Sequence, residues 1–229
     1  MTDLQDYPPQ VQDEIARTRE EVCELHAELT RWNLVVWTAS NVSQRLYSAD
    51  LMVIKPSGVR YDRLTPDDMV VCDLDGVLVD GDHSPSSDTA AHAYVYRHMP
   101  EIYGVVHTHS TYATAWAARG EEIPCVLTMI GDEFGGPVPV GPFAIIGDDS
   151  IGRGIVETLR DSRSPAVLMQ NHGPFTIGKT AEAAVKAAAM VEEVAHTVYV
   201  ARQLGDPLPI AQDLIDRLHD RYTTVYGQH

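Results

Sequence analysis

Short strand-like runs, separated by turn signals, constrain the fold of this chain more than any other feature. Residues 69–81, MVVCDLDGVLVDG, hold two apolar runs around Asp75-Gly76, a pair that favours a tight hairpin turn. Hairpins join antiparallel neighbours, whereas parallel strands need long crossover connections. Other strand-like runs occur at 34–38, 44–48, 51–58, 103–109, 123–130, 166–173 and 175–179. The sequence therefore predicts a mixed, largely antiparallel sheet.

Helical patterns lie between and after these runs. Apolar residues recur at helical spacing from Val11 to Leu29, and residues 180–204 form a long alanine-rich run that ends before Gly205. This long helix is either core or a subunit interface, and core is the favoured interpretation. Further helices are expected at 86–99, 111–120, 148–161 and near 210–222. We expect an α/β fold in one domain spanning 1–229, because no linker, repeat or low-complexity segment divides the chain.

The charge and the cysteines limit the partners. A net charge of −16 repels phosphate backbones, so nucleic acid is not an expected partner. The three cysteines follow no metal or disulfide spacing, which is typical of reduced thiols in the cytoplasm. No secretory signal and no apolar run of about 18 residues is present, so we expect a soluble cytoplasmic protein without a membrane segment.

Two histidines follow an apolar run in GVVHTHS. In a strand, residues two apart point to the same face, roughly 6.6 Å apart, so His107 and His109 can reach one ion. His172, in QNHGPF, follows another apolar run, and Asp88 stands at an expected helix start. Taken alone, His172 is better explained as a turn histidine. Three imidazoles and one carboxylate together suit zinc or another divalent transition ion with one position open.

Two stretches are suited to bind an anion through small side chains and backbone N–H groups. The first is the KPSG turn, and the second is the pair of serines at the start of the 86–99 helix, where the helix dipole favours negative charge. Taken alone, the first stretch is explained as a plain turn and the second as a plain N-cap. Their occurrence together with a candidate metal ligand, in a protein that is otherwise acidic, favours anion binding. The residues are Lys55, Ser57, Gly58, Ser86 and Ser87, with the amide of Asn41 as a further candidate.

Six motifs occur in a fixed order: SNVSQR, IKPSG, PSSDT, VVHTHS, NHGPF and YGQ. On these motifs the chain resembles the class II aldolase/adducin superfamily, and within it the L-ribulose-5-phosphate 4-epimerases. The resemblance implies a three-layer α/β/α fold and one divalent metal ion per subunit, with Zn²⁺ favoured and Mn²⁺, Co²⁺ or Ni²⁺ as alternatives. It also implies a homotetramer with sites between subunits.

The resemblance assigns roles to individual residues. The metal ligands would be Asp88, His107, His109 and His172. A phosphorylated ketose would be held by Ser40, Asn41, Lys55, Ser57, Gly58, Ser86 and Ser87. Asp132 and Tyr226 would act as the catalytic acid and base. The implied reaction interconverts L-ribulose 5-phosphate and D-xylulose 5-phosphate by breaking and remaking the C3–C4 bond.

Two departures from the epimerase pattern keep alternatives open. The family's usual GN is SN here, at Ser40. Residues 138–159 look more like the L-fuculose-1-phosphate aldolases, which are the main alternative, although those aldolases carry Glu where this chain has Asp88. A non-catalytic, adducin-like interaction domain is a further alternative, but such a domain would be expected to lack the metal ligands.

Overall fold

A continuous mixed sheet forms the centre of the molecule. The computed structural model describes residues 4–225. Within this range the strands are β1 (Asn41–Arg45), β2 (Leu51–Ile54), β3 (Val70–Asp73), β4 (Leu78–Asp80), β5 (Gly104–His107), β6 (Val140–Gly141), β7 (Ala166–Met169) and β8 (Gly173–Gly178). They are ordered β4-β3-β2-β1-β5-β8-β7-β6, and only the β6–β7 pair is parallel. The predicted mixed, largely antiparallel sheet is confirmed.

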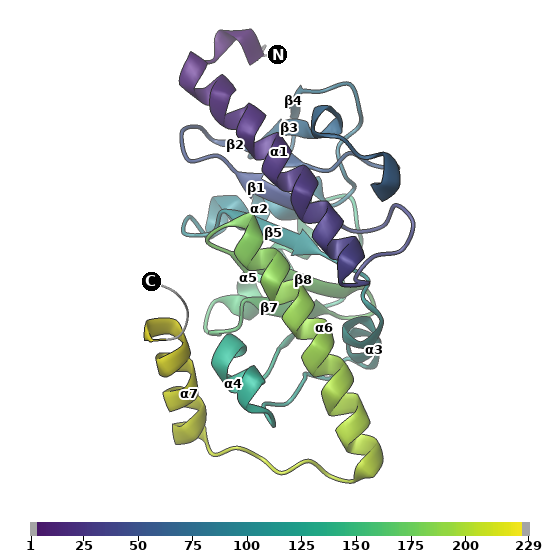
Figure 1. Ribbon diagram of the computed structural model, residues 1–229, viewed down its shortest axis with the longest axis vertical. Coiled ribbons are helices and arrows are strands. Elements are labelled where there is room, and N and C mark those ends of the chain that lie inside the picture. The colour runs from purple at the N-terminus through teal and green to yellow at the C-terminus, as the bar shows by residue number, and fades with distance from the viewer. Residues whose placement is uncertain (1–3, 226–229) are drawn as a thin grey trace.

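Helices cover both faces of this sheet. The described helices are α1 (Pro9–Arg31), α2 (Thr89–His98), α3 (Thr111–Arg119), α4 (Thr128–Phe134), α5 (Ser150–Leu159), α6 (Ala181–Leu204) and α7 (Gln212–Thr224). One buried cluster joins α1 and the first half of α6 to one sheet face, and a second joins α2 and α5 to the other face (Figure 1). The expected three-layer α/β/α fold is confirmed.

The long helix α6 belongs to the core. Its N-cap residue is Thr180, whose hydroxyl accepts a hydrogen bond from the Ala183 N–H. Its small residues, among them Ala184 and Ala188, are buried and let the helix lie close to the sheet. The preference for core is therefore confirmed. Although α6 is long, no helix within residues 4–225 is apolar enough over a sufficient length to cross a bilayer.

The hairpin predicted around Asp75-Gly76 is present as β3 and β4, which pair antiparallel. The Asp73 carboxylate accepts hydrogen bonds from the N–H groups of Asp75 and Val77, and the Gly76 N–H donates to the Asp73 carbonyl. A short aspartate side chain thus organises the turn, as is typical of Asx turns.

Two predicted strands are wrong. Residues 34–38 form no strand, because Asn33 and Trp37 have φ angles of 56° and 60° that turn the backbone, and Val36 and Trp37 are exposed. Residues 123–130 contribute a single bridge at Ile123, and the helix α4 then begins at Thr128. The two-residue strand β6 was not predicted, since so short a segment carries no periodic signal.

Candidate functional site

Three histidines meet at one end of strands β5 and β8. The ligand nitrogens of His107, His109 and His172 all lie within 4.8 Å of one another. His107 is the last residue of β5, and His172 lies in the turn between β7 and β8. The Nε2 atoms of His107 and His109 are 3.0 Å apart. The predicted grouping of these three side chains is therefore present.

The chain conformation that creates this grouping differs from a simple strand. Strand β5 ends at His107, so His109 lies beyond the strand and does not share its face in the expected way. The β7–β8 turn carries Asn171 at a φ of 59°, a conformation that asparagine tolerates better than most residues. An added Cβ at Gly173 would lie 2.7 Å from the Thr108 carbonyl oxygen, so only glycine lets the two segments approach this closely.

The environment keeps His107 neutral and leaves its Nε2 with a free lone pair that can bind a metal ion. Its Nδ1 lies 3.0 Å from the Pro174 carbonyl oxygen, which can only accept, so Nδ1 carries the proton. Burial, and the neighbouring His172 and His109, hold the pKa of His107 well below its usual value. Burial also lowers the pKa of His172. Neutral imidazoles held by a carbonyl on one side are typical of metal ligands.

Asp88 completes the candidate ligand set. It occupies the N-cap position of α2 without a capping hydrogen bond from its side chain, and it is only 4% exposed. Its Oδ2 accepts a hydrogen bond of 2.7 Å from Asn41 Nδ2, which also donates to Ser86 Oγ at 2.9 Å. Its Oδ1 is buried and has no hydrogen-bond partner among residues 4–225. Because an unpaired buried carboxylate oxygen is costly, this atom is suited to a cation beside the histidines.

A cavity of about 270 Å³ adjoins His109, His172 and Asp88. It is bounded by the turn 55–58, the helix start at 86–88 and the segment 38–41. Gly58 has a φ of 72°, which explains why the KPSG turn ends in glycine. The predicted substrate-binding residues Ser40, Asn41, Lys55, Ser57, Gly58, Ser86 and Ser87 all line this cavity.

Lys55 brings a buried positive charge to the cavity wall. Its Nζ donates to the carbonyl oxygens of Thr38 and Pro56 at 3.2 and 3.1 Å. The ammonium also lies 5.3 Å from the centre of the Tyr61 ring. Burial lowers the pKa of Lys55 to about 8, so the side chain is mostly charged at neutral pH. A local positive charge offsets the general negative field that would otherwise repel an anionic substrate.

Ser40 occupies a strained backbone position. Its φ is 79°, in the left-handed region that glycine adopts without cost and a residue with a Cβ does not. Its Oγ is buried and without a partner among the described residues. The departure from the family's usual GN therefore falls at a residue whose backbone conformation favours glycine.

Of the two predicted acid–base residues, the structure describes Asp132, and Asp132 is not at this cavity. Asp132 lies on α4, where its carbonyl accepts a hydrogen bond of 3.0 Å from His219 Nδ1 on α7. One of its carboxylate oxygens is buried and has no partner within the described chain. Asp132 is absent from the residues that line the cavity. Tyr226 lies outside the described residues.

Sequence reasoning missed several neighbours of the site. Thr38, Ala39 and Ile146 also line the cavity, and Tyr61 supports it from behind. Thr38 and Ala39 could have been found from their position directly before the SN motif. No local signal marks Ile146, because it reaches the cavity only through folding. His92 lies one helical turn after Asp88 on α2, and its Nδ1 pairs with Ser43 Oγ at 2.7 Å.

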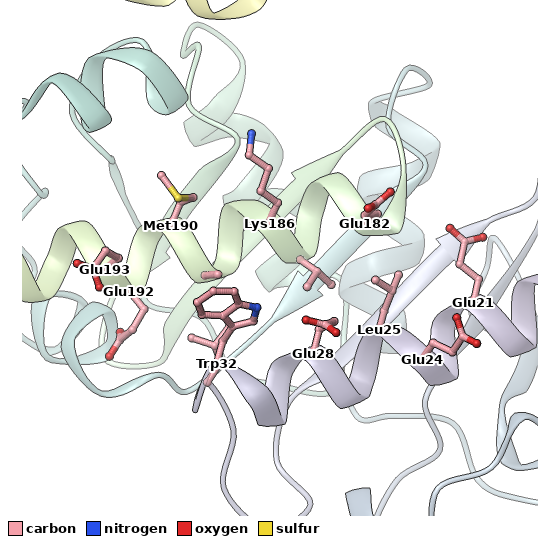
Figure 2. Close-up of a pocket in the computed structure, with 13 residues that line it drawn as sticks. Glu21, Glu24, Leu25, Glu28, Trp32, Glu182, Lys186, Met190, Glu192 and Glu193 are labelled. Carbon is pink, nitrogen blue, oxygen red and sulfur yellow. The ribbon is translucent and has the colours of Figure 1, made fainter. Parts of the chain in front are cut away.

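A larger hollow, of about 720 Å³, lies between α1 and α6 (Figure 2). Six glutamates border it, together with the exposed ring of Trp32. Its cation, Lys186, extends away from Trp32 in the figure and pairs with Glu133 at 2.7 Å. This hollow has no histidine in its lining, and its carboxylates would repel an anion. The candidate chemistry therefore belongs to the smaller cavity.

Proteins of known structure share this fold. Residues 20–199 match the class II aldolase and adducin N-terminal domain. An L-fuculose 1-phosphate aldolase is 26% identical with a TM-score of 0.85, over 90% of this chain and 96% of that chain. YgbL from Klebsiella pneumoniae, for which an aldolase, epimerase or decarboxylase activity has been put forward, is 27% identical with a TM-score of 0.78, over 90% and 99%. The L-fuculose-1-phosphate aldolase from Thermus thermophilus is 25% identical with a TM-score of 0.72, over 84% and 99%. This chain belongs to the class II aldolase and adducin family.

Proposed function

We propose that this protein is a metal-dependent L-ribulose-5-phosphate 4-epimerase, which interconverts L-ribulose 5-phosphate and D-xylulose 5-phosphate. One observation supports it most: the unpaired Oδ1 of Asp88 and the three clustered imidazoles adjoin a cavity lined by small polar side chains and a lysine. This combination suits a phosphorylated ketose whose carbon–carbon bond is broken and remade.

Asp88, His107, His109 and His172 would hold the metal ion. Three neutral nitrogens and one carboxylate oxygen form a donor set that zinc accepts readily, with Mn²⁺, Co²⁺ or Ni²⁺ also compatible. When bound, the ion supplies positive charge that stabilises the negative charge developing on the substrate oxygens as the C3–C4 bond breaks. The hydrogen bond from Asn41 would hold the Asp88 carboxylate in one orientation, which suits a metal ligand. A carboxylate held in this way is less suited to act as a catalytic base.

The cavity residues would bind the phosphate and keep the two fragments together. Lys55 attracts the phosphate, and Ser57 and Ser86 offer hydroxyl and backbone donors at a turn and a helix start. Retention of the aldehyde fragment is what separates epimerisation from aldol cleavage. An aldehyde that carries the phosphate stays bound through it, turns its other face and adds again.

Epimerisation needs a proton donor and acceptor for the C4 oxygen on each face. We assign these roles to Asp132 and Tyr226. Asp132 does not line the cavity of its own chain, which supports a site completed by a neighbouring subunit in a homotetramer. The helix α7, which ends at Thr224, packs against α4, so the helix that precedes Tyr226 and the helix that carries Asp132 form one unit. We extend the proposal to a single-domain, cytoplasmic enzyme.

A class II aldolase of L-fuculose-1-phosphate type is the second candidate. Ile146, which is about half exposed, adds an apolar wall to the cavity and would suit the methyl group of a deoxy sugar. The proteins of similar structure that carry this name favour the same alternative.

Product identification separates the two candidates. The metal-loaded protein is incubated with L-ribulose 5-phosphate and, separately, with L-fuculose 1-phosphate, and the products are separated and identified. We expect D-xylulose 5-phosphate from the first and no cleavage of the second. Release of dihydroxyacetone phosphate and lactaldehyde from the second, without epimerisation of the first, would replace the epimerase by the aldolase.

A further inference from the structure

The segment 38–42 forms one wall of the cavity, and side chains from three other elements hold its backbone. Lys55 Nζ donates to the Thr38 carbonyl at 3.2 Å. Tyr61 Oη carries one proton, and the hydrogen bond that it donates is shared between the Ala39 and Ser40 carbonyl oxygens, at 2.8 and 3.0 Å. These bonds account for three successive carbonyl groups directly before the strand β1.

The strand that follows is held from the other side. His26, on α1, is only 1% exposed, and its Nε2 accepts a hydrogen bond of 3.0 Å from the Val42 N–H. Its Nδ1 lies 2.6 Å from the Val22 carbonyl, to which it donates. The His26 and Tyr61 rings lie 5.9 Å apart, so the two supports are neighbours. We refer to His26, Lys55 and Tyr61 as the support cluster.

We propose that Tyr61 is a positioning residue for phosphate binding, which acts by capping the Ala39 and Ser40 carbonyls in the wall of the cavity. The proposal rests on the proposed function, since it takes this cavity as the phosphate site. It adds a residue that has no contact with the ligand and that the sequence motifs did not single out.

The argument is electrostatic. A carbonyl oxygen carries partial negative charge, and a free one in the wall of an anion site would weaken binding. Here Tyr61 binds two of these oxygens and Lys55 binds a third. Burial raises the pKa of Tyr61, so its hydroxyl stays protonated and remains a donor.

Tyr61 contacts the positively charged side chain of Lys55 as well as the backbone of the cavity wall. Its ring faces the Lys55 ammonium at 5.3 Å, within the range of a cation–π contact. The same side chain therefore restrains the strained Ser40 backbone and the lysine that attracts the phosphate. Loss of the hydroxyl alone would free both carbonyls and leave the ring contact in place.

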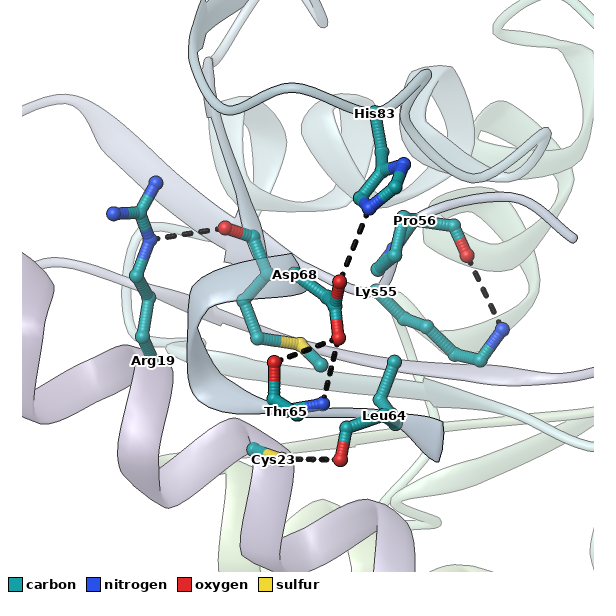
Figure 3. A network of polar contacts seen from close by, with 9 residues as sticks. Arg19, Cys23, Lys55, Pro56, Leu64, Thr65, Asp68 and His83 are labelled. Carbon is teal, nitrogen blue, oxygen red and sulfur yellow. Dashed lines mark hydrogen bonds and ion pairs between the residues drawn. The ribbon is translucent and has the colours of Figure 1, made fainter. Parts of the chain in front are cut away.

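The segment that follows Tyr61 is held by contacts of Leu64, Thr65 and Asp68 (Figure 3). Tyr61 begins the short helix η2 (Tyr61–Arg63), and the following Leu64 carbonyl accepts a contact of 3.7 Å from Cys23 Sγ on α1. Asp68 accepts hydrogen bonds from Thr65 and from His83. His83 lies next to Ser84, whose carbonyl accepts a hydrogen bond of 2.9 Å from the Ser57 N–H. These contacts join the segment that follows Tyr61 to the KPSG turn.

The test compares Tyr61→Phe with Tyr96→Phe. Tyr96 is a matched control, because its buried hydroxyl also makes two bonds to one residue of β1, Ser43, but none to residues 38–40. The dissociation constant of inorganic phosphate is measured by calorimetry on the metal-loaded protein, with metal content recorded for each variant. A third variant, Ser86→Leu, blocks the cavity and shows whether phosphate binds there.

We expect Tyr61→Phe to weaken phosphate binding about five- to tenfold, within the range by which residues without ligand contact change affinity, with metal content unchanged. Tyr96→Phe should change it less than about twofold. For a phosphorylated ketose, KM should rise and kcat should change little in Tyr61→Phe.

Two results would overturn the inference. The first is phosphate binding by Tyr61→Phe equal to that of the wild type or of Tyr96→Phe. The second is undiminished binding by Ser86→Leu, which would place the phosphate elsewhere. Failure of the proposed function is a separate result: if the wild type converts no phosphorylated ketose while Tyr61→Phe still loses phosphate affinity, the epimerase is refuted and the role of Tyr61 stands.

Discussion

Replacement of Ser40 by glycine should make the protein more stable, against the usual effect of glycine. Ser40 has a φ of 79°, and its Cβ makes this conformation unfavourable. Elsewhere in a folded chain glycine lowers stability relative to alanine by about 0.5–1 kcal/mol, because it gains more freedom on unfolding. At Ser40 the backbone strain acts in the opposite direction.

The expected size follows from two opposing terms. A residue other than glycine in the left-handed region costs about 1–2 kcal/mol. The greater flexibility of glycine in the unfolded chain offsets about 0.4–1 kcal/mol of the stability gained by removing this strain. The net gain for Ser40→Gly over Ser40→Ala is therefore about 0.5–1 kcal/mol. Ser40→Ala is the matched control, because it removes the buried, unpartnered hydroxyl and keeps the Cβ that causes the strain.

Urea unfolding of the metal-free protein without phosphate measures this difference, since any ligand of the folded state would add its own stabilisation. Ala49→Gly, at a residue without a positive φ, should lose stability by about 0.5–1 kcal/mol and calibrate the normal sign. If Ser40→Gly proves no more stable than Ser40→Ala, the backbone at Ser40 is not strained and the reasoning is refuted.

Three further predictions concern chemistry. Replacing His107 and His109 together by Asn should remove most of the bound metal, as measured by elemental analysis, and unchanged content would contradict the metal centre. The kcat/KM for a phosphorylated ketose should fall as pH rises through about 8, because the Lys55 ammonium is present below its pKa of about 8 and lost above it. If the Lys55→Met variant shows the same fall in kcat/KM, the fall is not due to Lys55. Tyr226→Phe should slow epimerisation about 100-fold, and mixing these chains with inactive Asp88→Asn chains should restore activity across the interface. Mixed oligomers no more active than their parents would exclude a tyrosine that acts on a neighbouring subunit.

The sequence was informative where function depends on short, contiguous motifs. The histidine pair, the KPSG turn and the serines before α2 each lie within a few residues of one another, and chain order alone identified them. Their convergence on one cavity could be expected only through the family resemblance, because β1, β5 and β8 are neighbours in the sheet but distant in sequence. The hydroxyl of Tyr61 carried no such signal, since a tyrosine after a turn is equally typical of surface packing.

Tertiary contacts explain the errors. The apolar run 34–38 resembles a strand, yet its backbone turns at Trp37. Of its residues only Leu34 is buried, and Val35 packs partly buried against the core. The predicted strand 123–130 runs into α4, which begins at Thr128 and packs against α7 so closely that a Cβ on Gly131 would lie 2.9 Å from Leu218 Cδ1. His109 was expected on the face of a strand that ends two residues earlier.

The proposed epimerisation needs more proton-transfer groups than the cavity lining offers. Its groups that can exchange a proton are His109, His172, Asp88 and Lys55. The first three are the candidate metal ligands, and the amine of Lys55 is engaged by two carbonyl groups. None of these is free to serve the C4 oxygen on both faces of the aldehyde, so epimerisation requires proton-transfer groups from outside this lining. Asp132 has a buried carboxylate oxygen without a partner in the described chain, on a helix that packs against the one leading to the tail. If an adjacent subunit presents that pair of helices to the cavity, a single assembly step supplies the missing acid and base and closes the reacting fragments off from water.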